Sequence, residues 1–216
     1  MLKAIIFDMD GTILNTIDDI LDSVNYALNH FNLPTKHVED VKLAVGNGAK
    51  HLIARVLDQG FKHPLFTEVY QTYQDYYDAH RMVKTAPYPD ILILLKQLKY
   101  DGYKLAVVSN KHDYLVKSLN VSLFEGLFEI AVGETKDRPL KPAPDVIFDV
   151  MDMLQVSPQE VIFIGDSDVD ILTAKHAGIQ SVGVTWGFRG IEELKREGAT
   201  YIIETPLSLL DIVKEM

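Results

Sequence analysis

Two aspartates separated by one residue follow the first apolar run of the chain, in the segment Asp8-Met9-Asp10-Gly11-Thr12. Side chains alternate along an extended chain, so Asp8 and Asp10 are expected on the same side and close together. Gly11 would let the chain turn sharply directly after them. An isolated pair of this kind is more often a polar turn whose carboxylates accept local N–H bonds. Alone, the segment is therefore weak evidence for a catalytic site.

A second group of carboxylates lies in residues 165–170, with the sequence GDSDVD, after another apolar run. Burying like charges together is costly without a cation, so Asp166 at the expected strand end is predicted to bind a metal. Asp168 is interpreted as a charge that complements a helix N-terminus. Together, Asp8, Asp10 and Asp166 could hold a hard divalent cation through oxygen, as Mg²⁺ prefers.

Two further segments carry groups that could bind an anion. Ser109, Asn110 and Lys111 place a hydroxyl, an amide and a cation at a predicted strand end, although Ser-Asn is also common helix-capping chemistry. Lys141 has prolines next to it, which favour a fixed position over the solvated one usual for lysine. Ser109, Lys141 and backbone N–H groups could surround a phosphate, and a metal would remove its repulsion from the acidic chain.

These segments follow short, β-rich apolar runs that alternate with helical patterns. The runs are residues 3–7, 104–108, 128–132, 161–164, 181–185 and, as an edge strand, 201–203. Amphipathic patterns cover residues 90–98 and 145–154. This alternation predicts a doubly wound α/β core with a parallel sheet, in which ligands bind at the carboxyl ends of the strands.

Residues 16 to about 81 break the alternation and show helical patterns alone. Thr16 is expected to cap a helix that stops by Pro34, and a second helix should follow Gly48. A third helix carries a tyrosine stripe over residues 66–77, which we interpret as packing. The predicted organisation is an α/β core domain of residues 1–15 and 83–216 and an inserted all-helical cap domain of residues 16–82, joined by linkers near residues 14–16 and 83–88.

Composition narrows the functional classes. The chain has 216 residues, 47% hydrophobic and 24% charged, as in ordinary globular proteins. With 31 acidic and 21 basic residues, its formal charge of −10 disfavours binding to nucleic acid or an anionic membrane. It has no cysteine, which excludes disulfides and thiolate chemistry. No apolar run approaches the ~20 residues of a membrane span, and carboxylates come too early for a signal peptide, so we expect a cytoplasmic protein.

The four polar segments, in this order, resemble the motifs of the haloacid dehalogenase superfamily of phosphotransferases, and the resemblance covers nearly the whole chain. The helical insert is similar to that family's smaller helical cap. Within the superfamily the chain most resembles phosphoglycolate phosphatases. The supporting segments are residues 45–49 (VGNGA), 109–111 (SNK), 177–178 (AG) and 185–188 (TWGF).

The resemblance implies a role for each site residue. Asp8 would be the nucleophile that forms an aspartyl-phosphate. Asp10 would be the general acid and base and would also offer its backbone carbonyl to Mg²⁺, while Asp8 and Asp166 would offer side-chain oxygens. Asp170 would orient Asp166 or a water molecule. Ser109, with Asn110 beside it, and Lys141 would bind the phosphoryl oxygens.

The second aspartate separates this chain from some relatives, because the dehalogenase and phosphonatase branches lack an aspartate at that position. Lys50 is similar to the Schiff-base lysine of phosphonatases, but with Asp10 present we interpret it as an exposed or substrate-steering charge. Gly46, Asn47, Gly48 and Lys50 are expected to contact the substrate where a helix starts, since its free N–H groups suit a carboxylate. An equally weighted alternative is a turn followed by solvated helix charges.

The predicted function is Mg²⁺-dependent hydrolysis of a small phosphorylated metabolite, with 2-phosphoglycolate as the first candidate. The alternatives are a phosphotransferase similar to β-phosphoglucomutase, a pyrophosphatase, a nucleotidase and, from a different class, a non-catalytic binding module. Loss of the nucleophile would mark the last, and Asp8 is present. The sequence makes no prediction of oligomeric state.

Overall fold

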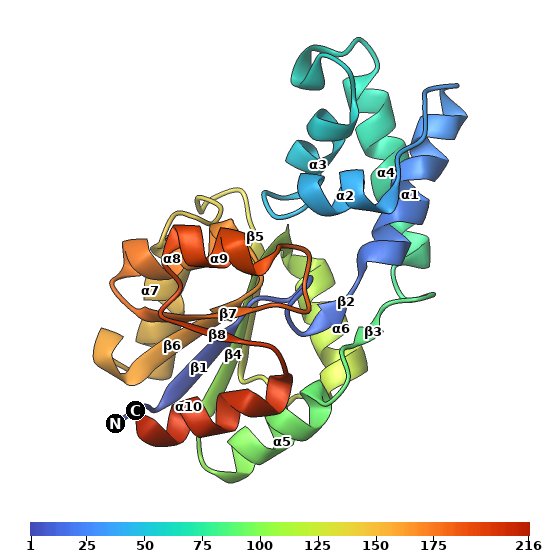
Figure 1. Ribbon diagram of the computed structural model, residues 1–216. Coiled ribbons are helices and arrows are strands. Elements are labelled where there is room, and N and C mark those ends of the chain that lie inside the picture. Colours follow the sequence, from blue (N-terminus) through green and yellow to red (C-terminus); the bar gives the residue numbers. More distant parts are fainter. The chain divides into compact units, whose positions relative to one another are not determined.

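The computed structural model describes all 216 residues, and the chain divides into two compact units (Figure 1). The core unit comprises Met1–Leu14 and Pro87–Met216, and the helical unit comprises Asn15–Ala86. The helical unit thus runs past the expected boundary at residue 82. Where the chain passes between the units, β2 (Leu14–Asn15) and β3 (Ala86–Pro87) form a two-stranded sheet.

The core unit is built on a six-stranded sheet whose strand pairs are all parallel, in the order β5-β4-β1-β6-β7-β8. The strands are β1 (Ala4–Phe7), β4 (Lys104–His112), β5 (Ile130–Glu134), β6 (Val161–Gly165), β7 (Gln180–Val184) and β8 (Tyr201–Ile203). Since β4 and β5 are added on one side of β1 and β6 to β8 on the other, the strand order reverses at β1. The predicted doubly wound α/β core is confirmed.

Both faces of this sheet are covered by helices (Figure 1). In β1, Ile5 and Phe7 belong to one apolar cluster, and Ala4 and Ile6 belong to another. The first cluster includes side chains of α5 (Ile91–Tyr100), α6 (Asp113–Phe124) and α10 (Leu209–Glu215); the second includes side chains of α7 (Asp145–Leu154) and α8 (Asp168–Ala177). Burial of β1 on both faces explains its uninterrupted apolar sequence.

The ends of two strands differ from the prediction. β4 continues to His112 rather than stopping at residue 108, and its pairing with β5 is irregular between Val108 and His112. The added residues are polar and do not alternate, so no apolar pattern marks them as a strand. β5 begins at Ile130 rather than at Phe128, whose ring packs edge-on against Phe7 in the core. Short 3₁₀ turns lie at Pro158–Glu160 and Pro206–Ser208, and α9 spans Ile191–Glu197.

The helical unit contains α1 (Ile17–His30), α2 (Val38–Ala44), α3 (Ala49–Val56), a 3₁₀ turn (Gly60–Lys62) and α4 (Phe66–His80). The helices expected after Thr16, after Gly48 and along the tyrosine stripe are present. Burial of Tyr73 and Tyr77 confirms that the stripe packs. Helix α2 is not predicted from the sequence, because a seven-residue helix with two buried side chains, Val41 and Ala44, has too few apolar positions to show a period.

One predicted helix cap is wrong. Thr16 precedes α1, but its backbone is already helical and its side chain makes no capping bond. Its hydroxyl oxygen is buried without a hydrogen-bond partner. At the same end of α1, the Asp19 carboxylate accepts the backbone N–H groups of Lys84 and Thr85 at 2.8–3.0 Å. The first turn of α1 is therefore tied to the returning segment of the unit. None of the helices is both long and apolar enough to cross a membrane.

Candidate active site at the carboxyl ends of the strands

Asp8 lies at the carboxyl end of β1, directly beside β6. Its backbone N–H donates to the carbonyl of Ile164 at 2.8 Å, which extends the pairing of the two strands by one residue. The loop then turns tightly, with Gly11 at φ 90°, a backbone conformation that favours glycine. A Cβ atom on Gly11 would lie 2.4 Å from Asp166 Oδ2, so the missing side chain also makes room for that carboxylate.

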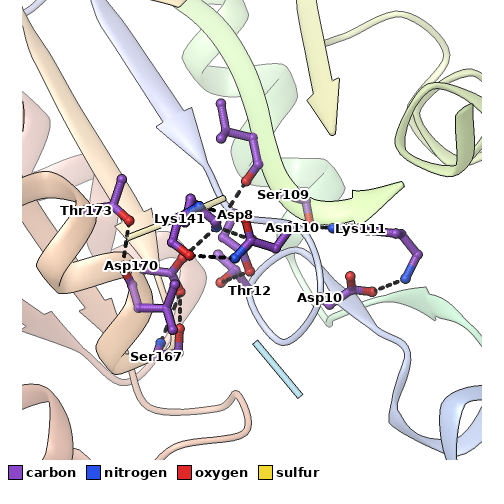
Figure 2. Close-up of polar contacts among 12 residues, drawn as sticks. Asp8, Asp10, Thr12, Ser109, Asn110, Lys111, Lys141, Ser167, Asp170 and Thr173 are labelled. Carbon is purple, nitrogen blue, oxygen red and sulfur yellow. Dashed lines mark hydrogen bonds and ion pairs between the residues drawn. The ribbon is translucent and has the colours of Figure 1, made fainter. Parts of the chain in front are cut away.

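Three buried carboxylates meet at this point. Oxygen atoms of Asp8, Asp166 and Asp170 all lie within 4.8 Å of one another. Lys141 Nζ lies 2.7 Å from Asp8 Oδ1 and 2.7 Å from Asp170 Oδ1, and the lysine is only 3% exposed (Figure 2). The third carboxylate of the cluster is thus Asp170, whereas the sequence analysis grouped Asp8 and Asp166 with Asp10.

The electrostatics of the cluster favour an additional cation. Burial raises the pKa of Asp8 to about 7, with Lys141 lowering it and Asp170 raising it further. Burial also raises the pKa of Asp166 well above its usual range, and Asp170 and Asp8 add to this. Burial acts to lower the pKa of Lys141, but attraction to Asp170 and Asp8 outweighs it and holds that pKa above its usual value.

Lys141 thus pairs with two of the three carboxylates, Asp8 and Asp170, and the donors available to a further cation are oxygens. A hard divalent cation is the ligand that such a set fits, and Mg²⁺ is the usual example in phosphate chemistry. The residues present therefore fit the expected metal.

Asn110 holds the segment that carries Lys141. Its side-chain Nδ2 donates to the Lys141 carbonyl at 2.9 Å, and its Oδ1 accepts the Lys141 N–H at 2.9 Å. The Lys141–Pro142 peptide bond is cis, and the ammonium lies 5.2 Å from the centre of the Phe163 ring. Both ends of the Asn110 amide are engaged with this backbone, so the Asn110 side chain fixes the segment that carries Lys141.

Asp10 forms an ion pair with a different lysine, Lys111. Its Oδ1 lies 2.7 Å from Lys111 Nζ, and the two side chains are 13% and 7% exposed. Figure 2 shows this pair pointing away from the group around Lys141. In the sequence, Lys111 is recognisable only as a cation that follows Ser109 and Asn110. Within the same segment, Ser109 Oγ accepts the Lys111 N–H at 3.2 Å.

The three aspartates of residues 165–170 differ in their surroundings. Asp166 Oδ2 accepts the backbone N–H of Phe188 at 2.6 Å. Asp170 Oδ2 accepts the N–H and the hydroxyl of Ser167 at 3.1 and 2.6 Å, which closes the first turn of α8. Asp168 begins α8, in agreement with its interpretation as a helix-end charge. Asp170 is therefore held by both Ser167 and Lys141.

The expected substrate segment, Gly46 to Lys50, lies in the helical unit. Helix α3 begins at Ala49, as predicted, and Lys50 is exposed. Arg55 donates to the Ala44 carbonyl at 3.0 Å and to Asn47 Oδ1 at 2.6 Å. Arg55, in α3, thus holds the segment in its conformation.

Comparison with known proteins agrees with this geometry. The family model described as haloacid dehalogenase-like hydrolase matches residues 5–184. A phosphoglycolate phosphatase of Haemophilus influenzae is 34% identical over 98% of both chains. A relative in Caldanaerobacter subterraneus with a provisional pyrophosphatase name, PpaX, is 33% identical over 99% of this chain and 95% of its own. The crystal structure described as a predicted phosphoglycolate phosphatase from Haemophilus somnus superposes with a TM-score of 0.92, at 29% identity over 98% of each chain.

The chain therefore belongs to the haloacid dehalogenase-like hydrolases. It is an enzyme of the phosphoric monoester hydrolase class, similar to the phosphoglycolate phosphatases.

Proposed function

We propose that this enzyme hydrolyses a small phosphate monoester in a Mg²⁺-dependent reaction that passes through a phosphorylated Asp8. The observation that carries the proposal is the pairing of the two aspartates after β1 with different lysines: Asp8 with Lys141 and Asp10 with Lys111. One carboxylate can then act as nucleophile while its neighbour handles protons, a division of work that requires different surroundings.

In the first half-reaction, a carboxylate oxygen of Asp8 forms a bond to phosphorus while the bond from phosphorus to the ester oxygen breaks. Asp10 gives its proton to the departing alkoxide. In the second half-reaction, Asp10 takes a proton from water, the water oxygen bonds to phosphorus, and Asp8 is released with inorganic phosphate. Lys141 and the Ser109 hydroxyl neutralise and hold the phosphoryl oxygens during both transfers.

The side-chain oxygens of Asp8 and Asp166 and the backbone carbonyl of Asp10 would hold Mg²⁺. When bound, Mg²⁺ supplies positive charge that attracts the anionic substrate and keeps Asp8 ionised. Asp170 would act through Lys141 and Ser167, which it contacts directly.

The first candidate substrate is 2-phosphoglycolate, which two features support. Curated relatives are named for it, and the helical unit, which we propose as a cap domain, carries Gly46, Asn47, Gly48 and Lys50 at a helix start that suits a carboxylate. Pyrophosphate is the second candidate, because the relative with a pyrophosphatase name is almost as similar. We propose a cytoplasmic location, where small phosphorylated metabolites occur.

The test is phosphate release from a panel of 2-phosphoglycolate, pyrophosphate, nucleoside monophosphates and glucose 1-phosphate, each with Mg²⁺ and with excess chelator. We expect the highest kcat/KM for 2-phosphoglycolate and loss of all activity in chelator. Preferred release from pyrophosphate would select the second candidate. Formation of a sugar bisphosphate rather than free phosphate would indicate a transferase. Rates unchanged in chelator would refute the metal-dependent mechanism.

A further inference from the structure

The segment between β7 and α9, residues 185–190 (TWGFRG), lies against the acidic cluster but takes no part in the chemistry above. We call it the 185–190 loop. Three of its residues contact the site. The Phe188 N–H donates to Asp166 Oδ2 at 2.6 Å, the Trp186 indole N–H donates to the Thr12 carbonyl at 3.0 Å, and Gly187 packs directly on Asp166.

Gly187 has no room for a side chain. A Cβ atom there would lie 2.3 Å from Asp166 Cβ, 2.4 Å from Asp166 Oδ2 and 2.5 Å from the Gly11 carbonyl oxygen. Each distance is far below van der Waals contact, and one of the atoms belongs to the backbone of the loop after β1. The close approach of the 185–190 loop to Asp166 therefore depends on glycine.

The loop is anchored on both sides of this contact. Before it, Trp186 ties the loop to Thr12, whose hydroxyl lies 3.4 Å from Asp166 Oδ1 and 3.5 Å from Asp8 Oδ2. After it, the mostly buried Arg189 places its Nε 3.4 Å from Glu193 and 3.8 Å from Asp168. The Phe188 N–H is thus fixed in position relative to the carboxylate that it binds.

The two oxygens of Asp166 consequently have different surroundings. Oδ2 is occupied by the Phe188 N–H, whereas Oδ1 lies on the side of Thr12 and Asp8. A ligating carboxylate whose orientation is fixed by a hydrogen bond loses less conformational freedom when a metal binds. Loss of such a supporting bond typically weakens metal affinity by about 10–100-fold.

We propose that the 185–190 loop is a positioning element for metal binding, in which Trp186 and Gly187 place the Phe188 N–H on Asp166 Oδ2 and leave Oδ1 for the cation. This inference rests on the proposed Mg²⁺-dependent function. The competing interpretation is that the loop only connects β7 to α9 and that its contacts with Asp166 do not affect the metal.

Mg²⁺ binding to the full-length enzyme without substrate, measured by isothermal titration calorimetry, separates the two. Gly187→Ala should raise the Kd for Mg²⁺ at least about tenfold. Trp186→Phe keeps an aromatic ring but removes the indole donor, and should raise it severalfold. Gly190→Ala is the matched control in the same loop, because a Cβ atom there meets nothing within 4 Å and its φ of −82° suits alanine. Its Kd should match wild type.

Steady-state kinetics give a second measurement. The Mg²⁺ concentration for half-maximal activity should rise in Trp186→Phe, while kcat at saturating Mg²⁺ recovers to the wild-type value. A general loss of structure would instead lower kcat at every Mg²⁺ concentration. Circular dichroism and thermal unfolding without Mg²⁺ check the fold, and if Gly187→Ala does not fold, Trp186→Phe decides.

Wild-type Kd values in both Trp186→Phe and a folded Gly187→Ala would overturn the inference and leave the proposed function standing. If the wild-type enzyme itself neither binds Mg²⁺ nor loses activity in chelator, the proposed function fails, and this inference falls with it.

Discussion

Asp10 and Lys111 form a nearly buried ion pair, 2.7 Å between Oδ1 and Nζ, although 101 positions separate them in the sequence. Asp8, two residues before Asp10, is bound by Lys141 instead. Lys111 thus orients the carboxylate of Asp10 and does not neutralise the carboxylate of Asp8. We therefore infer that Lys111 supports the proton transfer proposed for Asp10, a role that its sequence position alone does not reveal.

Replacement of Lys111 by methionine should therefore lower kcat about 10–100-fold with little change in the Kd for Mg²⁺, because a misdirected Asp10 serves proton transfer poorly. Lys111→Arg should recover part of the loss. Lys117→Ala is the control, since Lys117 forms an exposed pair with Asp113 in α6 and should behave as wild type. An equal loss of kcat in the arginine and methionine variants would contradict an orienting role for the charge.

Asp8→Asn should abolish turnover while the protein stays folded. The amide cannot attack phosphorus, yet it has nearly the same size, and burial already disfavours the charge of Asp8. Asp168→Asn, which lies outside the three-carboxylate cluster, should retain activity within severalfold. Phosphate release by Asp8→Asn within about tenfold of wild type would remove Asp8 as the nucleophile.

The segment from Gly46 to Lys50 should affect substrate choice rather than chemistry. Gly48 has a φ of 84°, which valine rarely adopts, and Lys50 is exposed in the first turn of α3. We expect the double variant Gly48→Val with Lys50→Ala to lose much more kcat/KM with 2-phosphoglycolate than with an uncharged aryl phosphate. Parallel losses with both esters would show that the segment is structural and does not recognise a carboxylate.

A surface group provides a test of pH-dependent stability. Hydrogen bonds from Lys3, and then from the backbone and hydroxyl of Ser157, lower the pKa of Glu160 to about 2 from 4.5. Since its pKa is lower in the folded state, Glu160 stabilises the protein above about pH 4.5, and this contribution disappears as the pH falls toward 2. Glu160→Gln should thus unfold at lower urea concentration than wild type at pH 7, with the difference shrinking at pH 3. A pH-independent difference would contradict this.

Much of the core and of its site could be predicted because the signals are local. Each buried strand is a short apolar run, and Asp8, Asp166 and Lys141 follow such runs or lie beside prolines. Contacts between distant segments were not predictable in this way. The pairing of Lys111 with Asp10, the engagement of Asn110 with the Lys141 backbone, and the contact of the 185–190 loop with Asp166 all depend on the fold that brings the segments together.

The features that were predicted wrongly, or not at all, also have physical explanations. Helix α2 is too short to show an apolar period, and the polar end of β4 does not alternate. Threonine is a frequent capping residue, but the backbone of Thr16 already has helical dihedral angles and its hydroxyl makes no capping bond. The first turn of α1 is instead tied to the returning chain, because the Asp19 carboxylate accepts the N–H groups of Lys84 and Thr85.

The backbone bond from Asp8 to Ile164 has a consequence for the dynamics of the enzyme. It joins the ends of β1 and β6, two strands that are fully buried inside the sheet. Amides in such strands exchange their hydrogens with solvent only when the whole domain opens, whereas loop amides exchange through local fluctuations. We therefore expect the carboxylate that we propose as nucleophile to lie in a slowly exchanging part of the molecule, and hydrogen exchange should place the Asp8 amide among the last to be replaced by deuterium.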